Sequence, residues 1–372
     1  MMATMNGALR LRPRGTWLVA SLELRQRLRS RGWIIALAVW TVVLLGLGFL
    51  VLAPTLYFAG WDHLAGTARV VLSLQIILVL FALLVVVPAL SAGSINGDRN
   101  AGTLAILQAS LLSSAEIVMG KLLAGWLTGL AFLVLALPST LITAVLAQTS
   151  PWYFLRMVAM IALIAACLTA LGLGLSSITV RQLSSVVLAY VVVFGVTVVL
   201  PVAFGAAATF VSQERQVTVY ESQPPPGWTG DDWTSEPDQS TWTCEPLEST
   251  QTVLRTDLVL PLLWANPVVM LAETAPSVNL RDTATADFGD LDALSGMKLL
   301  LQYAAAPAHP SHFVSCDPGQ EGYPEDLATM PQRPVGWIGV MLWLLVGGGS
   351  LALAIRRLAA PIRRLGRGTR IA

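Results

Sequence analysis

The chain has little charge and few of the side chains on which enzymes and metal sites usually depend. Charged residues make up 12% of its 372 residues, against about 25% in soluble domains. It has only three His and three Cys, and the spacing of His309 and His312 matches no established zinc pattern. With 55% hydrophobic residues, the composition excludes an ordinary soluble domain, and the sequence predicts no metal site.

Enzyme motifs are also missing. Gly120-Lys121 ends like a phosphate-binding loop, but Ala115 replaces the first Gly and Leu122 replaces the Ser or Thr. The segment Gly348–Ala352 lacks the last Gly of a nucleophile elbow. We therefore expect that the chain is not an enzyme and holds no cofactor of its own.

Long hydrophobic runs dominate what is present. Six runs contain no Asp, Glu, Lys or Arg, and a helix needs about 20 apolar residues to cross a bilayer. They are Gly32–Ala53, Val70–Leu90, Leu122–Leu146, the slightly shorter Met157–Leu175, Val186–Phe210 and Val335–Ile355. The sequence thus predicts an all-α integral membrane protein with six transmembrane helices. Because ion-coupled carriers usually need ionisable groups in the membrane, a secondary carrier is disfavoured, although broken helices can bind ions through carbonyls.

The basic residues predict that both ends of the chain are cytoplasmic. The flank 1–31 is rich in Arg with Glu23 as its only acid, and 356–372 carries Arg without any acid. Cytoplasmic flanks have such an excess of Lys and Arg. The first run is too long for a signal peptide and no cleavage site follows it, so it should remain as a span. This orientation places 91–121 and 176–185 inside and 54–69 and 147–156 outside.

The connection 211–334 has the opposite charge. All but four of the 22 Asp and Glu lie in it, so we expect an external domain. It contains Cys244 and Cys316, which we predict to form a disulfide; two unpaired thiols are the alternative. The apolar stretch Leu258–Leu271 is too short to span and contains two prolines, which favours a short or re-entrant helix. Four parts result: a cytoplasmic tail and helix (1–31), five spans (32–210), the external domain, and the last span with a basic tail (335–372).

An amphipathic helix is predicted ahead of the first span. In the segment Thr16–Arg31, apolar and small side chains recur at helical spacing and the arginines occupy the other side. Such a helix would lie on lipid at the inner leaflet. The alternative is a basic tail that acts only as a topology signal.

The loop 91–121 is the most informative polar segment. Its part TLAILQAS, residues 103–110, has an apolar stripe of Leu104 and Leu107, after Gly102 as a hinge and Thr103 as a cap. We expect this helix to dock in a groove on a partner, and Asp98 and Arg99 to help transmit the partner's motion into the membrane. An ordinary loop with solvated polar residues is the alternative.

These segments resemble the type-2 permeases of ATP-binding-cassette (ABC) exporters. Asp98 to Leu104 is similar to the family's first cytoplasmic loop, with Asp98 in place of the usual Glu, and Gly120-Lys121 to the start of the third span. Glu23 to Arg31 looks like the family's elbow helix. The turn around Arg181 and the segment Trp264–Pro267 are similar to later family segments, but the roughly sixty residues 275–334 that follow depart from compact members.

The resemblance implies a permease that dimerises with a second permease copy, binds a separate ABC ATPase carrying ATP and Mg, and sits in a bacterial cell membrane. It implies ATPase coupling through Asp98, Arg99, Gly102, Thr103, Leu104 and Leu107. It also implies a translocation path lined by Gln75, Phe81, Tyr190, Phe194 and Thr197. The charge-free spans suggest export of a drug or lipid, and no nucleic-acid partner is expected.

Two alternatives remain open at this point. One is a non-transporting assembly in which an ATPase drives signalling or envelope remodelling through the external domain. The other is a channel or receptor without an ATPase, for which the segment Gly102 to Leu104 would tolerate substitution.

Overall fold

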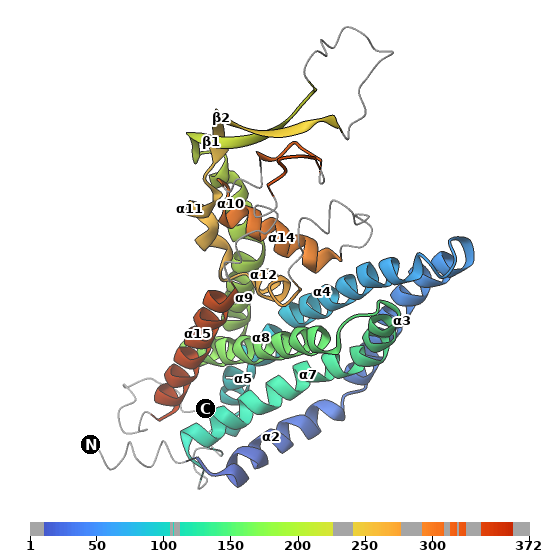
Figure 1. The fold of residues 1–372 in the computed structure, drawn as a ribbon. Helices are drawn as coiled ribbons and strands as arrows, with labels where there is room; N and C mark the ends of the chain where they lie inside the picture. The colour runs from blue at the N-terminus through green and yellow to red at the C-terminus, as the bar shows by residue number, and fades with distance from the viewer. Residues whose placement is uncertain are drawn as a thin grey trace. The chain divides into compact units, whose positions relative to one another are not determined.

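The computed structural model describes most of the chain (Figure 1). Described are residues 11–104, 107, 112–225, 241–276, 292–308, 313–317, 320–324 and 336–359. The chain forms two compact units, one of residues 1–198 and 337–372 and the other of 199–336. The first ten residues, the end of the basic C-terminal tail, most of the predicted docking helix 103–110 and both His309 and His312 lie outside the described residues.

The first unit is helical. Its elements are α2 (Pro13–Leu28), α3 (Arg31–Phe58), α4 (Leu64–Ser91), α5 (Ser94–Asn100), α7 (Ser114–Leu146), α8 (Pro151–Ile178), α9 (Gln182–Phe194) and α15 (Gly336–Leu358). After α9 the helix continues as η1 (Gly195–Val199), a π-helical turn, and α10 (Leu200–Ala208), which belongs to the second unit. Among the residues that the structure describes, six helices are long and apolar enough to cross a membrane, in agreement with the predicted number of spans.

Close contacts between small residues hold the helices of this unit together. Helix α4 contacts α3, α7, α8 and α9. A Cβ on Gly172 of α8 would lie 2.0 Å from the Oγ of Ser91, and one on Gly174 would lie 2.6 Å from the Cβ of Ser350 in α15. Because lipid gives no hydrophobic drive between helices, such close packing is the main source of their association.

The second unit contains a β-ribbon, so the all-α prediction is wrong for this segment. Strands β1 (Ser212–Gln223) and β2 (Thr243–Leu254) pair antiparallel, from Ser212 opposite Leu254 to Gln223 opposite Thr243. The long, Pro-rich connection between the strands hides the hairpin from a search for short turns. The signals that point to it are the alternation of polar and apolar residues in Gln216–Val219 and the β-branched residues Thr250, Thr252 and Val253 in the second strand.

Short helices form the rest of this unit. They are α11 (Thr256–Val259), η3 (Leu260–Leu263), α12 (Pro267–Ala272) and α14 (Ala293–Ala305). Pro261 and Pro267 do not kink one helix, as expected, but stand in the first turns of η3 and α12, where the missing N–H costs nothing. The side chain of Asn266 caps α12 by accepting hydrogen bonds from Val268 and Val269.

The predicted disulfide is present. Cys244 in β2 is joined to Cys316, 72 residues later, and Cys167 in α8 is a buried free cysteine. The segment around Cys316 lies along the ribbon, because the N–H of Ser315 donates to the carbonyl of Tyr220 and the N–H of Cys244 donates to that of Glu321. In chain-entropy estimates a bridge over a loop of this length contributes about 4 kcal/mol.

The pairing predicts a simple thiol count. Under denaturing, non-reducing conditions one thiol per chain, that of Cys167, should react with a maleimide, and all three cysteines should react after reduction. Intact-mass spectrometry of the labelled chain measures both numbers. Three labels without reduction would contradict the disulfide, and the Cys167→Ser variant should lose the single label.

Candidate functional site

A buried lysine joins three segments at one end of the first unit. The Nζ of Lys121 in α7 lies 2.5 Å from the Oε1 of Glu23 in α2 and 2.6 Å from the Oδ2 of Asp98 in α5. The Lys121 side chain is 2% exposed. A buried ammonium group is tolerated only when charges and hydrogen bonds replace its water. These two carboxylates therefore fix α2 and α5 to the start of α7.

Arg27 extends this cluster along α2. Its guanidinium lies 3.7 Å from Glu23 and donates a 2.9 Å hydrogen bond to the hydroxyl of Thr128 in α7. Burial lowers the pKa of Arg27 from its ordinary value, and the nearby Glu23 carboxylate opposes that shift. Because an arginine side chain stays protonated in proteins, Arg27 adds a second charged tie between α2 and α7.

The two helices also meet through backbone contacts. Glu116 closes a capping box with Ser113 at the start of α7 and accepts a 2.9 Å hydrogen bond from the N–H of Arg12. A Cβ on Gly120 would lie 2.5 Å from the Cβ of Val19 and 2.9 Å from the carbonyl oxygen of Thr16. Only glycine allows α2 to approach α7 this closely.

The predicted segregation of charge on this N-terminal helix is wrong. Its exposed residues include Leu18 and Leu22 together with Arg14 and Arg25. The side that faces α7 carries Glu23, whose carboxylate binds Lys121. The pairing with α7, rather than a division into apolar and basic faces, decides how the helix is oriented.

Asn96 and Arg99 join α5 to the connection between α8 and α9. The buried amide of Asn96 donates to the hydroxyl oxygens of Thr179, at 2.9 Å, and of Ser185, at 3.4 Å. Arg99 donates to the Asn96 side-chain oxygen and to the carbonyl of Thr179. Two cytoplasmic connections of the predicted topology are therefore one hydrogen-bonded assembly.

The surface of this assembly is formed by the turn after α5. Gly102 follows the helix with φ of +73° and has open space around its α-carbon, which matches the usual glycine after a helix C-cap. Around it Asn100, Ala101 and Thr103 are exposed. The hydroxyl of Thr103 donates to the carbonyl of Asp98, so the turn is braced from within.

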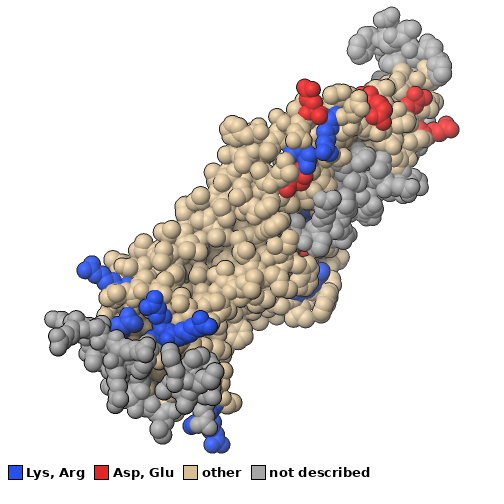
Figure 2. Space-filling model, turned by 90° about the vertical axis from the view of Figure 1, so that its left-hand side faces the viewer, with Lys and Arg blue, Asp and Glu red and all other residues tan. Residues whose placement is uncertain are grey.

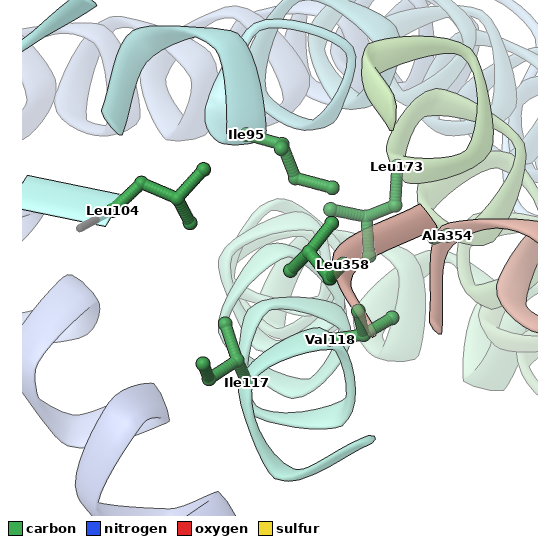
Figure 3. Close-up of a cluster of buried hydrophobic side chains, with 7 residues drawn as sticks. All are labelled: Ile95, Leu104, Ile117, Val118, Leu173, Ala354 and Leu358. Carbon is green, nitrogen blue, oxygen red and sulfur yellow. The ribbon is translucent and has the colours of Figure 1, made fainter. Parts of the chain in front are cut away.

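Leu104 does not belong to that surface. It is 6% exposed and lies in an apolar cluster made by α5, α7, α8 and α15, with Leu107 packed against it. Figure 3 shows the side chains of this cluster, which are Ile95, Leu104, Ile117, Val118, Leu173, Ala354 and Leu358. Leu104 was expected to belong to an apolar stripe that docks in a groove on a partner, but its side chain packs inside this protein. Any role of Leu104 in coupling therefore has to act through this packing.

Two exposed apolar residues on the neighbouring connection were missed by sequence reasoning. Val180 is 78% exposed and Leu183 is 74% exposed. They lie on either side of Arg181. Because the residues around them are small or polar, the segment looks like an ordinary polar turn in the sequence, and nothing there singled these two residues out. Their position next to Thr179, which Asn96 and Arg99 bind, places them on the same assembly as the α5 turn.

The residues predicted to line a path do not share one surface. Gln75 is fully buried, where its amide donates to the carbonyl of Leu44 and the hydroxyl of Ser139 and so ties α4 to α3 and α7. Phe81 on α4 and Phe194 on α9 are 43% and 59% exposed. The hydroxyl of Tyr190 donates to the carbonyl of Val85, which holds α9 beside α4.

Thr197 lies in the π-helical turn η1 and donates to the carbonyl of Val193 in its own helix. Phe81, Tyr190, Phe194 and Thr197 thus belong to the paired helices α4 and α9 and the turn that follows α9. We leave Gln75 out of the path, because its side chain serves helix packing.

Charge is distributed differently on the two units. On the face drawn in Figure 2, Lys and Arg gather at one end of the first unit, and Asp and Glu lie on the second unit. Among the residues that the structure describes, no group of three or more His, Cys, Asp or Glu is arranged to hold a metal ion.

Six helices of the described part of the chain that are long and apolar enough to cross a membrane define a multi-pass membrane protein. The family of ABC-2 transporter proteins matches residues 17–309. The chain belongs to this family and is a membrane subunit of an ABC transporter. A comparison with curated proteins finds no match.

The charged cluster predicts an asymmetric response to substitution. Lys121→Met should destabilise the purified protein by about 3 kcal/mol, because Glu23 and Asp98 would face each other without a cation. In the triple variant Glu23→Gln/Lys121→Met/Asp98→Asn much of this loss should be recovered, since no unpaired charge remains. Thermal unfolding in detergent, followed by circular dichroism, measures both. Equal midpoints for the wild type and Lys121→Met would show that the cluster contributes nothing to stability.

Proposed function

We propose that this subunit pairs with a second permease copy, binds a separate ATPase at its cytoplasmic face and exports a hydrophobic or amphipathic substrate. The observation that carries the proposal is the assembly around Lys121, Asn96 and Arg99. It links an exposed turn directly to the ends of four membrane helices. An element with that connectivity suits the transmission of motion from a partner into the membrane.

The ATPase would dock on two neighbouring surfaces. One is the turn of Asn100, Ala101 and Thr103, and the other is the apolar pair Val180 and Leu183. Exposed apolar residues beside a polar rim are typical of protein interfaces. A push on the turn would reach α7 through Asp98 and Lys121, and reach α8 and α9 through Asn96. In this proposal Arg99 and Gly102 shape the turn, and Leu104 and Leu107 support it from inside.

The proposed orientation follows from charge. The basic ends of the chain and the α5 turn face the cytoplasm, and the acidic second unit faces outward. The helix α2 would rest on the inner leaflet through its exposed Trp17, Leu18 and Leu22. The host would be a bacterium and the membrane its cell membrane. ATP and Mg would be bound by the partner and not by this chain.

The substrate would pass along α4 and α9. The side chains of Phe81 and Phe194 are exposed and apolar, and Tyr190 and Thr197 add hydroxyl groups nearby. In a pair of permeases these faces would border a shared path. A path without charged side chains favours an apolar or amphipathic cargo, such as a drug or lipid.

A second candidate function is favoured by the organisation of 199–336, which has its own buried residues, a disulfide and a long ribbon. In such an assembly, ATP hydrolysis would drive a movement of this unit that acts on an envelope protein, and no substrate would be transported. The two functions differ in what stimulates the ATPase: a transported compound in the first case and an external protein in the second.

The docking surface can be tested by affinity purification from the native host in mild detergent. We expect Val180→Asp to reduce the co-purified ATPase at least about tenfold, the effect of losing about 1.4 kcal/mol of binding, without lowering the unfolding midpoint. Leu247→Asp is the matched control, since Leu247 is an exposed leucine on β2, and it should retain the ATPase. If no ATPase co-purifies with the wild type under several detergents, the permease proposal fails.

The turn gives a second prediction. Gly102→Ala has room for its side chain but places a Cβ at φ of +73°, which costs about 1–2 kcal/mol. Substrate-stimulated ATPase activity should fall, while Gly102→Asn should keep more of it because Asn tolerates this conformation better. Gly296→Ala in α14 is the matched control, because its added Cβ also meets nothing within 4 Å but its φ is not positive. Full activity in Gly102→Ala would mean that the shape of the turn does not matter for coupling.

A further inference from the structure

The ribbon of the second unit has an open edge. The N–H of Arg255 donates to the carbonyl of Val211, one step beyond the pair Ser212 and Leu254. Hydrogen-bonded and non-hydrogen-bonded pairs alternate in an antiparallel ladder. The odd-numbered residues therefore bond across the ribbon, and the N–H and C=O groups of the even-numbered residues point away from it.

The disulfide end of the ribbon confirms this assignment. There the carbonyl of Tyr220 accepts from Ser315 and the N–H of Cys244 donates to Glu321, so even-numbered residues on both strands bind added segments of the same chain. Val314 and Glu321 form isolated parallel bridges at these places. The ribbon thus already binds extra strands along part of its length.

The rest of both edges has no such partner. Within the described residues, no backbone hydrogen bond from outside the ribbon reaches the outward groups of Glu248, Thr250 and Thr252 on β2, or those of Glu214 and Gln216 on β1. A two-stranded ribbon with mostly exposed residues is marginally stable by itself. A long open edge is also a template for pairing with another strand.

The two edges differ in sequence. The free part of β1 carries Glu214 and Arg215, and charges on an edge oppose pairing. The free part of β2, Glu248–Leu254, has one charge, on Glu248 at its end, and no Pro or Gly, and it contains Thr250, Thr252 and Val253. This composition favours strand pairing, so β2 offers the better edge.

We infer that β2 pairs antiparallel with β2 of a second copy, so that two ribbons form one four-stranded sheet outside the membrane. The inference rests on the proposed function, in which two copies share one membrane and one orientation. Identical edges related by a two-fold axis meet antiparallel. With the axis at Thr250 or Gln251, Glu248 lies opposite an uncharged residue, and no like charges face each other. Because the single charge of this edge then faces no like charge, the edge can pair with a copy of itself.

Cysteine cross-linking of the full-length protein in native membranes tests this. Single variants Thr250→Cys and Gln251→Cys should each give a cross-linked dimer with a short bifunctional maleimide, because facing residues in an antiparallel pair have Cα atoms about 4.5–5.5 Å apart. Glu214→Cys, at an outward position of β1, is the matched control and should stay monomeric on the gel. Equal cross-linking of Glu214→Cys, or a ladder of higher oligomers, would overturn the assignment of the edge.

Proline substitution tests the backbone hydrogen bonds of the proposed pairing. Thr250→Pro removes an outward N–H without removing a bond of the ribbon, and should abolish the cross-link of Gln251→Cys. Gln216→Pro does the same on β1 and should leave that cross-link intact. Retention of the cross-link in Thr250→Pro/Gln251→Cys would overturn strand pairing.

The mass of the purified, uncross-linked protein separates this inference from the proposed function. A dimer by light scattering in which neither Thr250→Cys nor Gln251→Cys cross-links would overturn the paired ribbons and leave the permease dimer standing. A monomer that still binds the ATPase would overturn both.

Discussion

The arrangement of one end of the first unit depends on one constraint: the ammonium group of Lys121 has almost no contact with solvent and must be surrounded by carboxylates. Glu23 and Asp98 supply them from segments far apart in the sequence. The cost of a buried charge without partners exceeds the stability of many domains. The pairing therefore fixes where α2 and α5 lie against the start of α7.

The membrane part could be read from the sequence because it depends on one property, the length of uncharged apolar runs. Helix ends were less predictable: α7 begins at Ser114, well before the run that starts at Leu122, because Ser113 and Glu116 cap it. The β-ribbon was not predicted, because a long connection separates its two strands in the sequence. The disulfide was accessible, since only Cys244 and Cys316 lie outside the spans.

Within the candidate site, the sequence indicated which residues lie close together along the chain better than it indicated which way their side chains point. The sequence singled out Asp98, Arg99 and Gly102 in one polar segment, and the structure places them in α5 and in the turn that follows it. Their partners Lys121, Asn96 and Thr179 could be identified only from the folded chain. Leu104 shows the limit: a leucine after a glycine turn has the same pattern whether it faces a partner or its own core. Only the neighbouring Ile95, Ile117 and Leu358 determine which of the two applies.

The link between Cys244 and Cys316 also sets an order of events during synthesis. The bond cannot close until the chain has been made and translocated past Cys316, and in the proposed orientation only a short segment then remains before the last span begins at Gly336. Until that moment the ribbon lacks both its covalent tie and the segment that lies along it. Oxidation of the second unit can therefore begin only shortly before α15 is inserted, so the ribbon enters the last stage of synthesis without its covalent tie.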